Sequence, residues 1–341
     1  MCDRFAELVI GKPSLDAEFT QIDSPADFQA QSLVFVSEPA QMFSLDGELP
    51  AALVTTEKIA AGLNGSDLCV VAVKDVRLAQ ALIKQHYADY DASDPEWDAL
   101  HPSAVIHPSA RLGDNVRIGA NTVIGKNVQI GTNTQVRANC VIESNAQIGE
   151  NCIINNLVNI GIGCILHNRI ILRPGVIIGN EGFGFGQDDQ RHYHRTPHTG
   201  IVEIHDDVQI GANCNIDRAT YGKTVIARGV KIDALCHVAH NCLVDEDALF
   251  VAQTGIAGSC HIGKRVIISG QTGVIDHRTV ADDAVLVHRC GVTHDIPTAG
   301  MWAGTPAKPI KEYVRDLNLS KKVAKLEKKI ELLLGKQDHK S

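Results

Sequence analysis

An apolar residue recurs at every sixth position over most of this chain. From Ile106 to Ile178, thirteen consecutive positions spaced by six are aliphatic. The register returns at Ile204, and after a shift of four residues it runs unbroken from Ile226 to Val292. A period of six is too long for one face of an α-helix and too regular for ordinary hairpins. The pattern therefore predicts one short strand and one turn in every hexad.

Three such hexads make one triangular coil, in which the apolar side chains point inward. Glycine follows nine of the apolar positions and tolerates the tight turn that each corner needs. We predict a mainly β fold, a left-handed parallel β-helix of about nine coils over residues 101–306.

The period is lost at residues 180–200, an excursion rich in glycine, histidine and charge, and loops that leave a regular scaffold commonly carry function. Residues 1–100 predict a separate small α/β domain, with short strands at 31–37, 51–56 and 67–73 and an amphipathic helix at 76–90. Residues 307–341 predict basic helices.

Composition narrows the class of protein. The formal net charge of −8 argues against a nucleic-acid binder. Neither a transmembrane run nor a secretory signal is expected, which favours a cytoplasmic location. The ten cysteines form no C-x-x-C pair and predict small buried residues rather than a zinc or redox site. Residues 301–341 carry ten Lys and Arg against five Asp and Glu. This predicts either an acidic partner or an ordinary solvated helix.

Two histidines lie in the segment KIDALCHVAHNC, residues 231–242: His237 and His240. Gly258 follows His240 by three hexads, so one full coil places it directly above His240. His277 is 37 residues after His240, which places it two coils above His240 and one residue round, at the same corner. A histidine base beside an uncrowded backbone N–H is the arrangement that acyl transfer needs.

Three blocks resemble one known family. GNEGFGF at 179–185, TGIVEIHDDVQIGANCNIDRA at 199–219 and IDALCHVAHN at 232–241 are similar to the UDP-3-O-acylglucosamine N-acyltransferases of lipid A synthesis. The resemblance implies a homotrimer that moves an (R)-3-hydroxyacyl chain from acyl carrier protein to the 2-amine of a UDP-linked, O-acylated glucosamine. It implies no metal and no organic cofactor of its own, since phosphopantetheine arrives with the donor.

The resemblance also implies roles for single residues. His240 would be the general base and Gly258 N–H the oxyanion donor. Substrate contacts would come from His277, from Asp233 near the base, from His237, and from Phe183 and Phe185 beside the acyl groove. The residues expected to bind acyl carrier protein are the basic ones of the tail: Lys308, Lys311, Arg315, Lys321, Lys322 and Lys325.

The N-terminal domain departs from the family pattern. Phe35 matches a phenylalanine that stacks on uridine in the family, but Glu38 and Gln41 replace its asparagine and tyrosine. This leaves open a divergent paralogue with a different amino-sugar acceptor. Two small residues, Cys290 and Gly291, lie near the expected end of the acyl groove and favour a long chain.

Three other functions remain open on the sequence. His192, His194 and His198 suggest a metal-dependent hydratase on the same solenoid. An acetyl-CoA-dependent sugar acetyltransferase would share the histidine base but would need neither the excursion nor the basic tail. A non-catalytic scaffold would need none of these residues.

Overall fold

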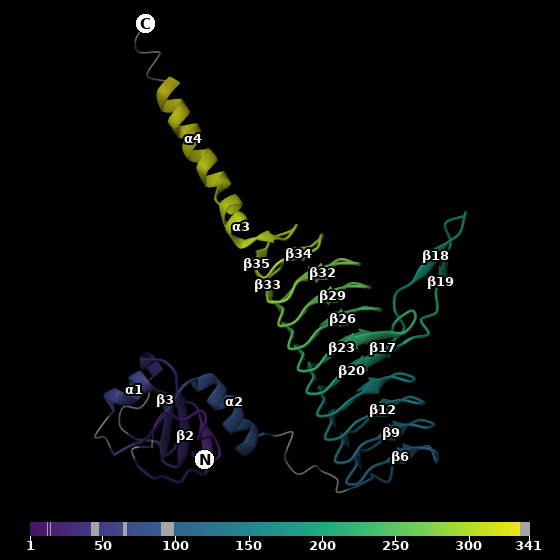
Figure 1. Ribbon diagram of the computed structural model, residues 1–341, viewed down its shortest axis with the longest axis horizontal. Coiled ribbons are helices and arrows are strands. Elements are labelled where there is room, and N and C mark those ends of the chain that lie inside the picture. Colours follow the sequence, from purple (N-terminus) through teal and green to yellow (C-terminus); the bar gives the residue numbers. More distant parts are fainter. Residues whose placement is uncertain (12, 14, 42–47, 64–66, 90–98, 335–341) are drawn as a thin grey trace. The chain divides into compact units, whose positions relative to one another are not determined.

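The computed structural model describes residues 1–341 except 12, 14, 42–47, 64–66, 90–98 and 335–341 (Figure 1). The chain separates into two compact units, Met1–Pro95 and Glu96–Ser341. Each unit has its own hydrophobic core, so each is described by itself.

The N-terminal unit is a small parallel sheet with two helices. Its strands run in the order β1 (Gln21–Asp23), β2 (Ser32–Val36), β3 (Ala52–Thr56) and β4 (Cys69–Val73). Helix α1 (Glu57–Gly62) follows β3, and helix α2 (Val76–Tyr87) follows β4. Asp75 caps α2 by accepting hydrogen bonds from the backbone N–H groups of Arg77 and Leu78. The central strands are apolar along most of their length because both faces of a parallel sheet are covered.

The second unit is a parallel β-solenoid with three sheets. Sheet I contains β7 (Arg117–Ile118), β10 (Gln135–Val136), β13 (Ile153–Ile154), β16 (Ile171–Leu172), β21 (Gln209–Ile210), β24 (Lys231–Ile232), β27 (Leu249–Phe250), β30 (Ile267–Ile268), β33 (Ala284–Leu286), β35 (Gly300–Ala303) and the antiparallel β36 (Lys308–Pro309). Sheet II contains β5 (Val105–Ile106), β8 (Val123–Ile124), β11 (Val141–Ile142), β14 (Asn159–Ile160), β17 (Ile177–Asn180), β22 (Asn215–Asp217), β25 (His237–Val238), β28 (Gly255–Ile256), β31 (Gly273–Val274) and β34 (Gly291–Val292). Sheet III contains β6 (Arg111–Leu112), β9 (Gln129–Ile130), β12 (Gln147–Ile148), β15 (Ile165–Leu166), β20 (Ile201–Ile204), β23 (Lys223–Ile226), β26 (Leu243–Val244), β29 (His261–Ile262) and β32 (Thr279–Val280).

Every predicted hexad position falls on one of these strands, and its side chain points into the prism. In sheet II, Ile124 pairs with Ile142, Ile142 with Ile160, and Ile160 with Ile178, and all four are buried. Stacked coils thus place residues that are three hexads apart directly above one another. The predicted parallel β-helix is confirmed.

The corners depend on a backbone conformation that most residues avoid. Asn115, Asn121, Asn127 and the equivalent residues of many later hexads have φ near +57°, in the left-handed region. Asparagine tolerates this region better than other residues with a side chain. Its amide also bonds the next coil: Asn115 Nδ2 donates to Asn133 Oδ1, and Asn133 Nδ2 donates to Asn151 Oδ1.

The cysteines are packing residues, as predicted from their spacing. Nine of the ten are buried, and only Cys2 is partly exposed. Cys140 Sγ donates to the carbonyl oxygen of Asn155 at 3.0 Å. Burial raises the pKa of Cys140 and Cys152 to about 11, so these thiols stay protonated at neutral pH.

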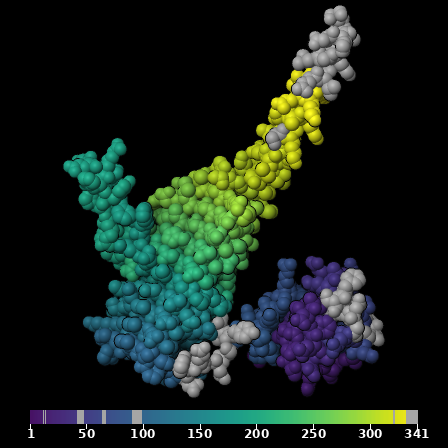
Figure 2. Space-filling view, turned by 180° about the vertical axis from the view of Figure 1, so that it is seen from behind, coloured from purple at the N-terminus to yellow at the C-terminus, as the bar shows by residue number. Residues whose placement is uncertain are grey.

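Two segments leave the prism (Figures 1 and 2). Residues 180–200 form an excursion whose outer part is a hairpin of β18 (Phe185–Gln187) and β19 (Tyr193–Arg195). At the C-terminal end of the solenoid, helix α3 (Ile310–Leu317) contacts β35 and β36, and helix α4 (Leu319–Leu334) follows it. No helix in the described part of the chain is both long and apolar enough to cross a membrane.

One column of corners allows a test of the left-handed constraint. Asn139 (φ +57°) and Leu157 (φ +64°) are one coil apart, and Leu157 is exposed. A residue with a Cβ and no local polar contact loses about 1–2 kcal/mol in this conformation. Leu157→Asn should therefore increase the free energy of unfolding by about 1 kcal/mol and raise the thermal unfolding midpoint. The reciprocal Asn139→Leu should lower it, and equal midpoints for both variants would contradict the explanation.

Candidate active site

His240 lies on the corner that follows β25, and Asn241 fixes its ring. The Asn241 side chain is oriented by Thr220, whose backbone N–H donates to Oδ1 at 2.9 Å and whose Oγ1 accepts from Nδ2 at 3.1 Å. The same Nδ2 lies 2.9 Å from His240 Nδ1. Because this amide nitrogen can only donate, Nδ1 of the neutral imidazole is the acceptor and Nε2 carries the proton.

Gly258 and His277 stack above His240, as the predicted coil requires. The His240 ring packs against the backbone of Gly258: a Cβ built on Gly258 would be 2.5 Å from His240 Cε1. The backbone N–H of His277 donates to the carbonyl oxygen of Gly258 at 3.0 Å. Within the described part of the chain, no backbone acceptor takes the N–H of Gly258. A side chain at 258 would displace the imidazole, so glycine is required here.

The excursion covers the other side of the ring. His198 is 5% exposed, and its ring centroid lies 4.8 Å from that of His240 in an edge-to-face contact. Its Nδ1 donates to the Thr196 carbonyl, while Nε2 is buried with no hydrogen-bond partner among the described residues. The GFGF motif permits this approach, because a Cβ on Gly182 would come within 2.8 Å of both histidine side chains.

The surroundings of His240 favour its neutral form. Burial is the largest cause that lowers its pKa, and His198 and His277 lower it further. Asp217, buried in the neighbouring coil, acts in the opposite direction. The net result is a pKa below the ordinary value, so the imidazole is an unprotonated base at neutral pH.

A cavity of about 820 Å³ opens from His240 and runs up sheet II to Thr305. We call it the His240 cavity. It is floored by glycines at consecutive outward positions of paired strands: Gly255 is opposite His237, Gly273 opposite Gly255, and Gly291 opposite Gly273. A Cβ on Gly255 or Gly273 would meet nothing within 4 Å, whereas one on Gly291 would contact Thr305. The result is a smooth apolar groove that is closed in at its far end.

A second cavity, of about 620 Å³, lies beside the excursion. Phe183 and His237 line both cavities, and Phe185 and Asp217 line only the second. The Phe183 ring is highly exposed and contacts Phe185 edge to face at 4.9 Å. His237 Nε2 lies 3.5 Å from the Asp217 carboxylate. The two expected phenylalanines therefore do lie at the mouth of the site.

Two of the expected substrate residues lie elsewhere. Asp233 is on the preceding corner, after β24, where its carboxylate accepts from the backbone N–H groups of Ala234 and Ala252. Asn241, not Asp233, orients His240 within one chain. Phe35 is buried in the core of the N-terminal unit, and its role in stacking on uridine stays a prediction. Gln41 Oε1 accepts from the N–H groups of Ser37 and Glu38 and closes a turn.

The histidines of the excursion do not converge on a metal. His192 and His194 both face the Asp188 carboxylate on the hairpin, at 3.5 and 2.8 Å. His198 lies elsewhere, against His240. The spacing of these three residues thus reflects a hairpin followed by a return to the prism.

Comparison with known proteins decides the family. A UDP-3-O-acylglucosamine N-acyltransferase of Methylococcus capsulatus is 50% identical over 303 residues, which cover 89% of this chain and 86% of the relative. This chain belongs to the UDP-3-O-acylglucosamine N-acyltransferase family. The acyltransferase predicted from its sequence motifs is confirmed.

Other comparisons agree with this family. The enzyme of that name from Wolinella succinogenes is 42% identical over 41% of this chain and 44% of its own length. A solved UDP-N-acetylglucosamine acyltransferase of Arabidopsis superposes with a TM-score of 0.55 at 25% identity, covering 61% of this chain and 72% of its own. A family model described as the GMPPB C-terminal domain matches residues 99–182.

The neighbours of the base are what sequence reasoning missed in this family member. The sequence indicates His198 only as a metal ligand, and Asn241 only as part of the block IDALCHVAHN. The signal for Asn241 was its place at the left-handed corner immediately after the base. For His198 no period exists, because residues 180–200 lie outside the repeat.

The depressed pKa of His240 can be measured directly. In an NMR titration, its midpoint should lie below the ordinary value of about 6.5. His198→Gln should move the midpoint upward but not fully to that value, because burial, the larger cause, remains. A histidine-containing model peptide in the same buffer supplies the reference. A His240 midpoint at or above that of the peptide would contradict the assigned environment.

Proposed function

We propose that this chain transfers an (R)-3-hydroxyacyl group from acyl carrier protein to the 2-amine of UDP-3-O-acylglucosamine, with His240 as the general base. The observation that carries the proposal is the placement of His240 against Gly258 at the foot of a glycine-floored groove. Family membership supports the same reaction.

The chemistry follows from the two groups. The amine attacks the thioester carbonyl and loses a proton to the imidazole of His240. The carbonyl oxygen becomes an oxyanion, and the N–H of Gly258 stabilises it. The C–N bond then forms fully, the C–S bond breaks, and the imidazolium returns its proton to the leaving thiolate. These steps use only groups of the chain and of its two substrates.

One hydrogen bond of His240 must open before the ring can accept that proton. Because Nε2 carries the ring proton, the accepting lone pair is on Nδ1, where Asn241 Nδ2 donates. We infer that the Asn241 contact is the one that opens when the acceptor binds, while two hydrogen bonds to Thr220 keep the amide in place.

The groove fits an extended acyl chain. Gly255, Gly273 and Gly291 remove every side chain from these positions of its floor, and Thr305 closes it. Each coil adds about 4.8 Å of length. The three glycines therefore support a long acyl chain that lies along sheet II, away from His240.

The tail supports an acidic donor as partner. Lys308 and Arg315 are both paired with Asp316. The side chains of Lys311, Lys321, Lys322 and Lys325 have no ion pair among the described residues and remain available for acidic groups. A cytoplasmic location follows from this donor and stays a prediction.

Exposed apolar surface supports assembly into a trimer. Val105, Val123, Val141 and Ile177 lie at outward positions of sheet II, 37–63% exposed. On helix α4, Val323, Leu326 and Ile330 are also exposed, with the 3–4 spacing typical of a helix that packs on another helix. Neighbouring subunits would cover both surfaces.

Replacing the base should slow turnover by orders of magnitude. His240→Ala should lower kcat by about 10²–10⁴ in transfer from (R)-3-hydroxyacyl carrier protein to UDP-3-O-acylglucosamine. His261→Ala, which removes a surface histidine paired with Asp245, should leave kcat unchanged. Size-exclusion chromatography checks that both variants keep the wild-type assembly. Turnover in His240→Ala within threefold of wild type would overturn the role of His240.

The acceptor can be tested in the same assay. If wild type assembles normally but does not acylate UDP-3-O-acylglucosamine, the alternative of another amino-sugar acceptor is favoured. The replaced residues Glu38 and Gln41 motivate this alternative. Other nucleotide-linked amino sugars, offered with the same donor, then identify the acceptor.

Filling the groove should shorten the preferred chain. Gly273→Leu places a side chain where a Cβ meets nothing within 4 Å, so the fold is kept and the groove is blocked. The variant should lose at least about tenfold in kcat/KM with long acyl donors, which need the space that the leucine fills, and retain activity with short ones. A series of acyl carrier proteins of graded chain length measures this. Equal losses for all chain lengths would show that the acyl chain lies elsewhere.

A further inference from the structure

Two histidines occupy a corner position where neighbouring coils have glycine. Gly113, Gly131 and Gly149 follow the inward residues of β6, β9 and β12, and His167 and His205 take the same place in the next two coils. In the chain, the excursion lies between the two histidines. Leu166 and Ile204 are paired in sheet III, so the two histidines follow directly from paired residues.

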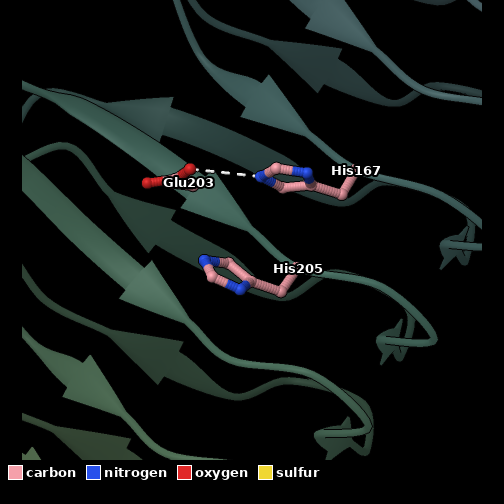
Figure 3. Close-up of side chains that lie close together, drawn as sticks. All are labelled: His167, Glu203 and His205. Carbon is pink, nitrogen blue, oxygen red and sulfur yellow. Dashed lines mark hydrogen bonds and ion pairs between the residues drawn. The ribbon is translucent and has the colours of Figure 1, made fainter.

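A carboxylate completes the group. Glu203 is at the outward position of β20, opposite Ile165 of β15. Its Oε1 lies 3.1 Å from His167 Nε2, and the two imidazole centroids are 5.0 Å apart. One ligand atom from each of the three residues lies within 4.8 Å of the other two. Figure 3 shows both rings extending from their corners toward the side on which Glu203 lies.

One oxygen of the Glu203 carboxylate remains for a metal ion. Lys223 Nζ donates to Glu203 Oε2 at 2.7 Å, and an ammonium pairs in this way with an ionised carboxylate. The carboxylate is therefore ionised. Lys223 uses one oxygen and leaves Oε1 facing the imidazole of His167.

The donor set identifies the class of ion. Two imidazole nitrogens and one carboxylate oxygen are ligands typical of Zn²⁺ and of its first-row neighbours. Ligand atoms bound tetrahedrally at ~2.1 Å lie ~3.4 Å apart, so small side-chain rotations would close the group around an ion. His167 also borders a surface groove of about 470 Å³, which leaves an approach for the ion and for a water ligand.

We propose that His167, Glu203 and His205 form a binding site for one divalent transition-metal ion, separate from the His240 cavity. His167 precedes the excursion and His205 follows it. A bound ion therefore bridges the two coils from which the excursion leaves and returns. Because it binds the folded chain, it stabilises that part of the solenoid. The site takes no part in acyl transfer and stands independently of the proposed reaction.

Metal binding to the full-length, tag-free chain tests the site. The chain is stripped with a chelator, and Zn²⁺ is titrated in competition with a chromophoric indicator. Co²⁺ in place of Zn²⁺ reports coordination through its visible spectrum. We expect one equivalent per chain in wild type and at least about a tenfold loss of affinity in His205→Ala and in Glu203→Gln.

Three further variants separate this site from other binders. Lys223→Gln should tighten Zn²⁺ binding, because the competing ammonium is removed from Glu203. His261→Ala and His194→Ala, each of which removes a histidine paired with an aspartate, should bind Zn²⁺ as wild type does. The proposal is overturned if His205→Ala keeps the wild-type affinity and Co²⁺ spectrum, or if His194→Ala alone loses them.

Discussion

The left-handed backbone conformation that recurs at the corners is the constraint on which the solenoid depends. Each such corner turns the chain toward the next face because one residue adopts a positive φ, and asparagine, glycine or aspartate fill most of these places. The conformation is unfavourable for residues with a Cβ. This conformational cost is offset by the packing of the inward aliphatic side chains and by hydrogen bonds between corner side chains of successive coils, such as Asn127 to Asn145. Where leucine occupies a corner, at Leu157 and Leu235, no side-chain hydrogen bond assists, and the packing and backbone pairing of the neighbouring coils sustain it.

The same constraint places the proposed catalytic groups. Asn241 and His277 are themselves left-handed corner residues, and His240 precedes one of them. A side chain at a corner projects away from the prism, yet its backbone is fixed by the coils above and below. His240, Gly258 and His277 thus come together without any loop that must order itself. Rigid placement of a base and an oxyanion donor is what lowers the entropic cost of acyl transfer.

The periodic part of the chain could be predicted from the sequence, and the irregular part could not. Counting three hexads per coil places Gly258 over His240, and the structure agrees. The same count puts Asp233 on the preceding corner, so its separation from His240 follows from their spacing, which exceeds one hexad.

His198 follows no period, because it lies where the excursion returns to the prism. The burial of Phe35 does not follow from its sequence, because an unbroken apolar run such as β2 does not tell core from surface. The relation of His167 to Glu203 was hidden by the excursion, which separates in sequence two coils that are adjacent in space.

A prism of constant cross-section has flat faces, so a binding site requires that its regularity be broken. Two departures do this here, and they act on the same corner. The excursion adds a wall that carries Phe183 and His198, and three outward glycines on sheet II lower the floor beside it. Without the excursion, the imidazole of His240 would lie on an open surface, where water would keep its pKa near the ordinary value. Without the glycines, the half-buried base would have no groove along which an acyl chain could reach it. The excursion lowers the pKa of the His240 imidazole, and the glycines keep the ring accessible. The base is therefore neutral at the pH where an amine must be deprotonated.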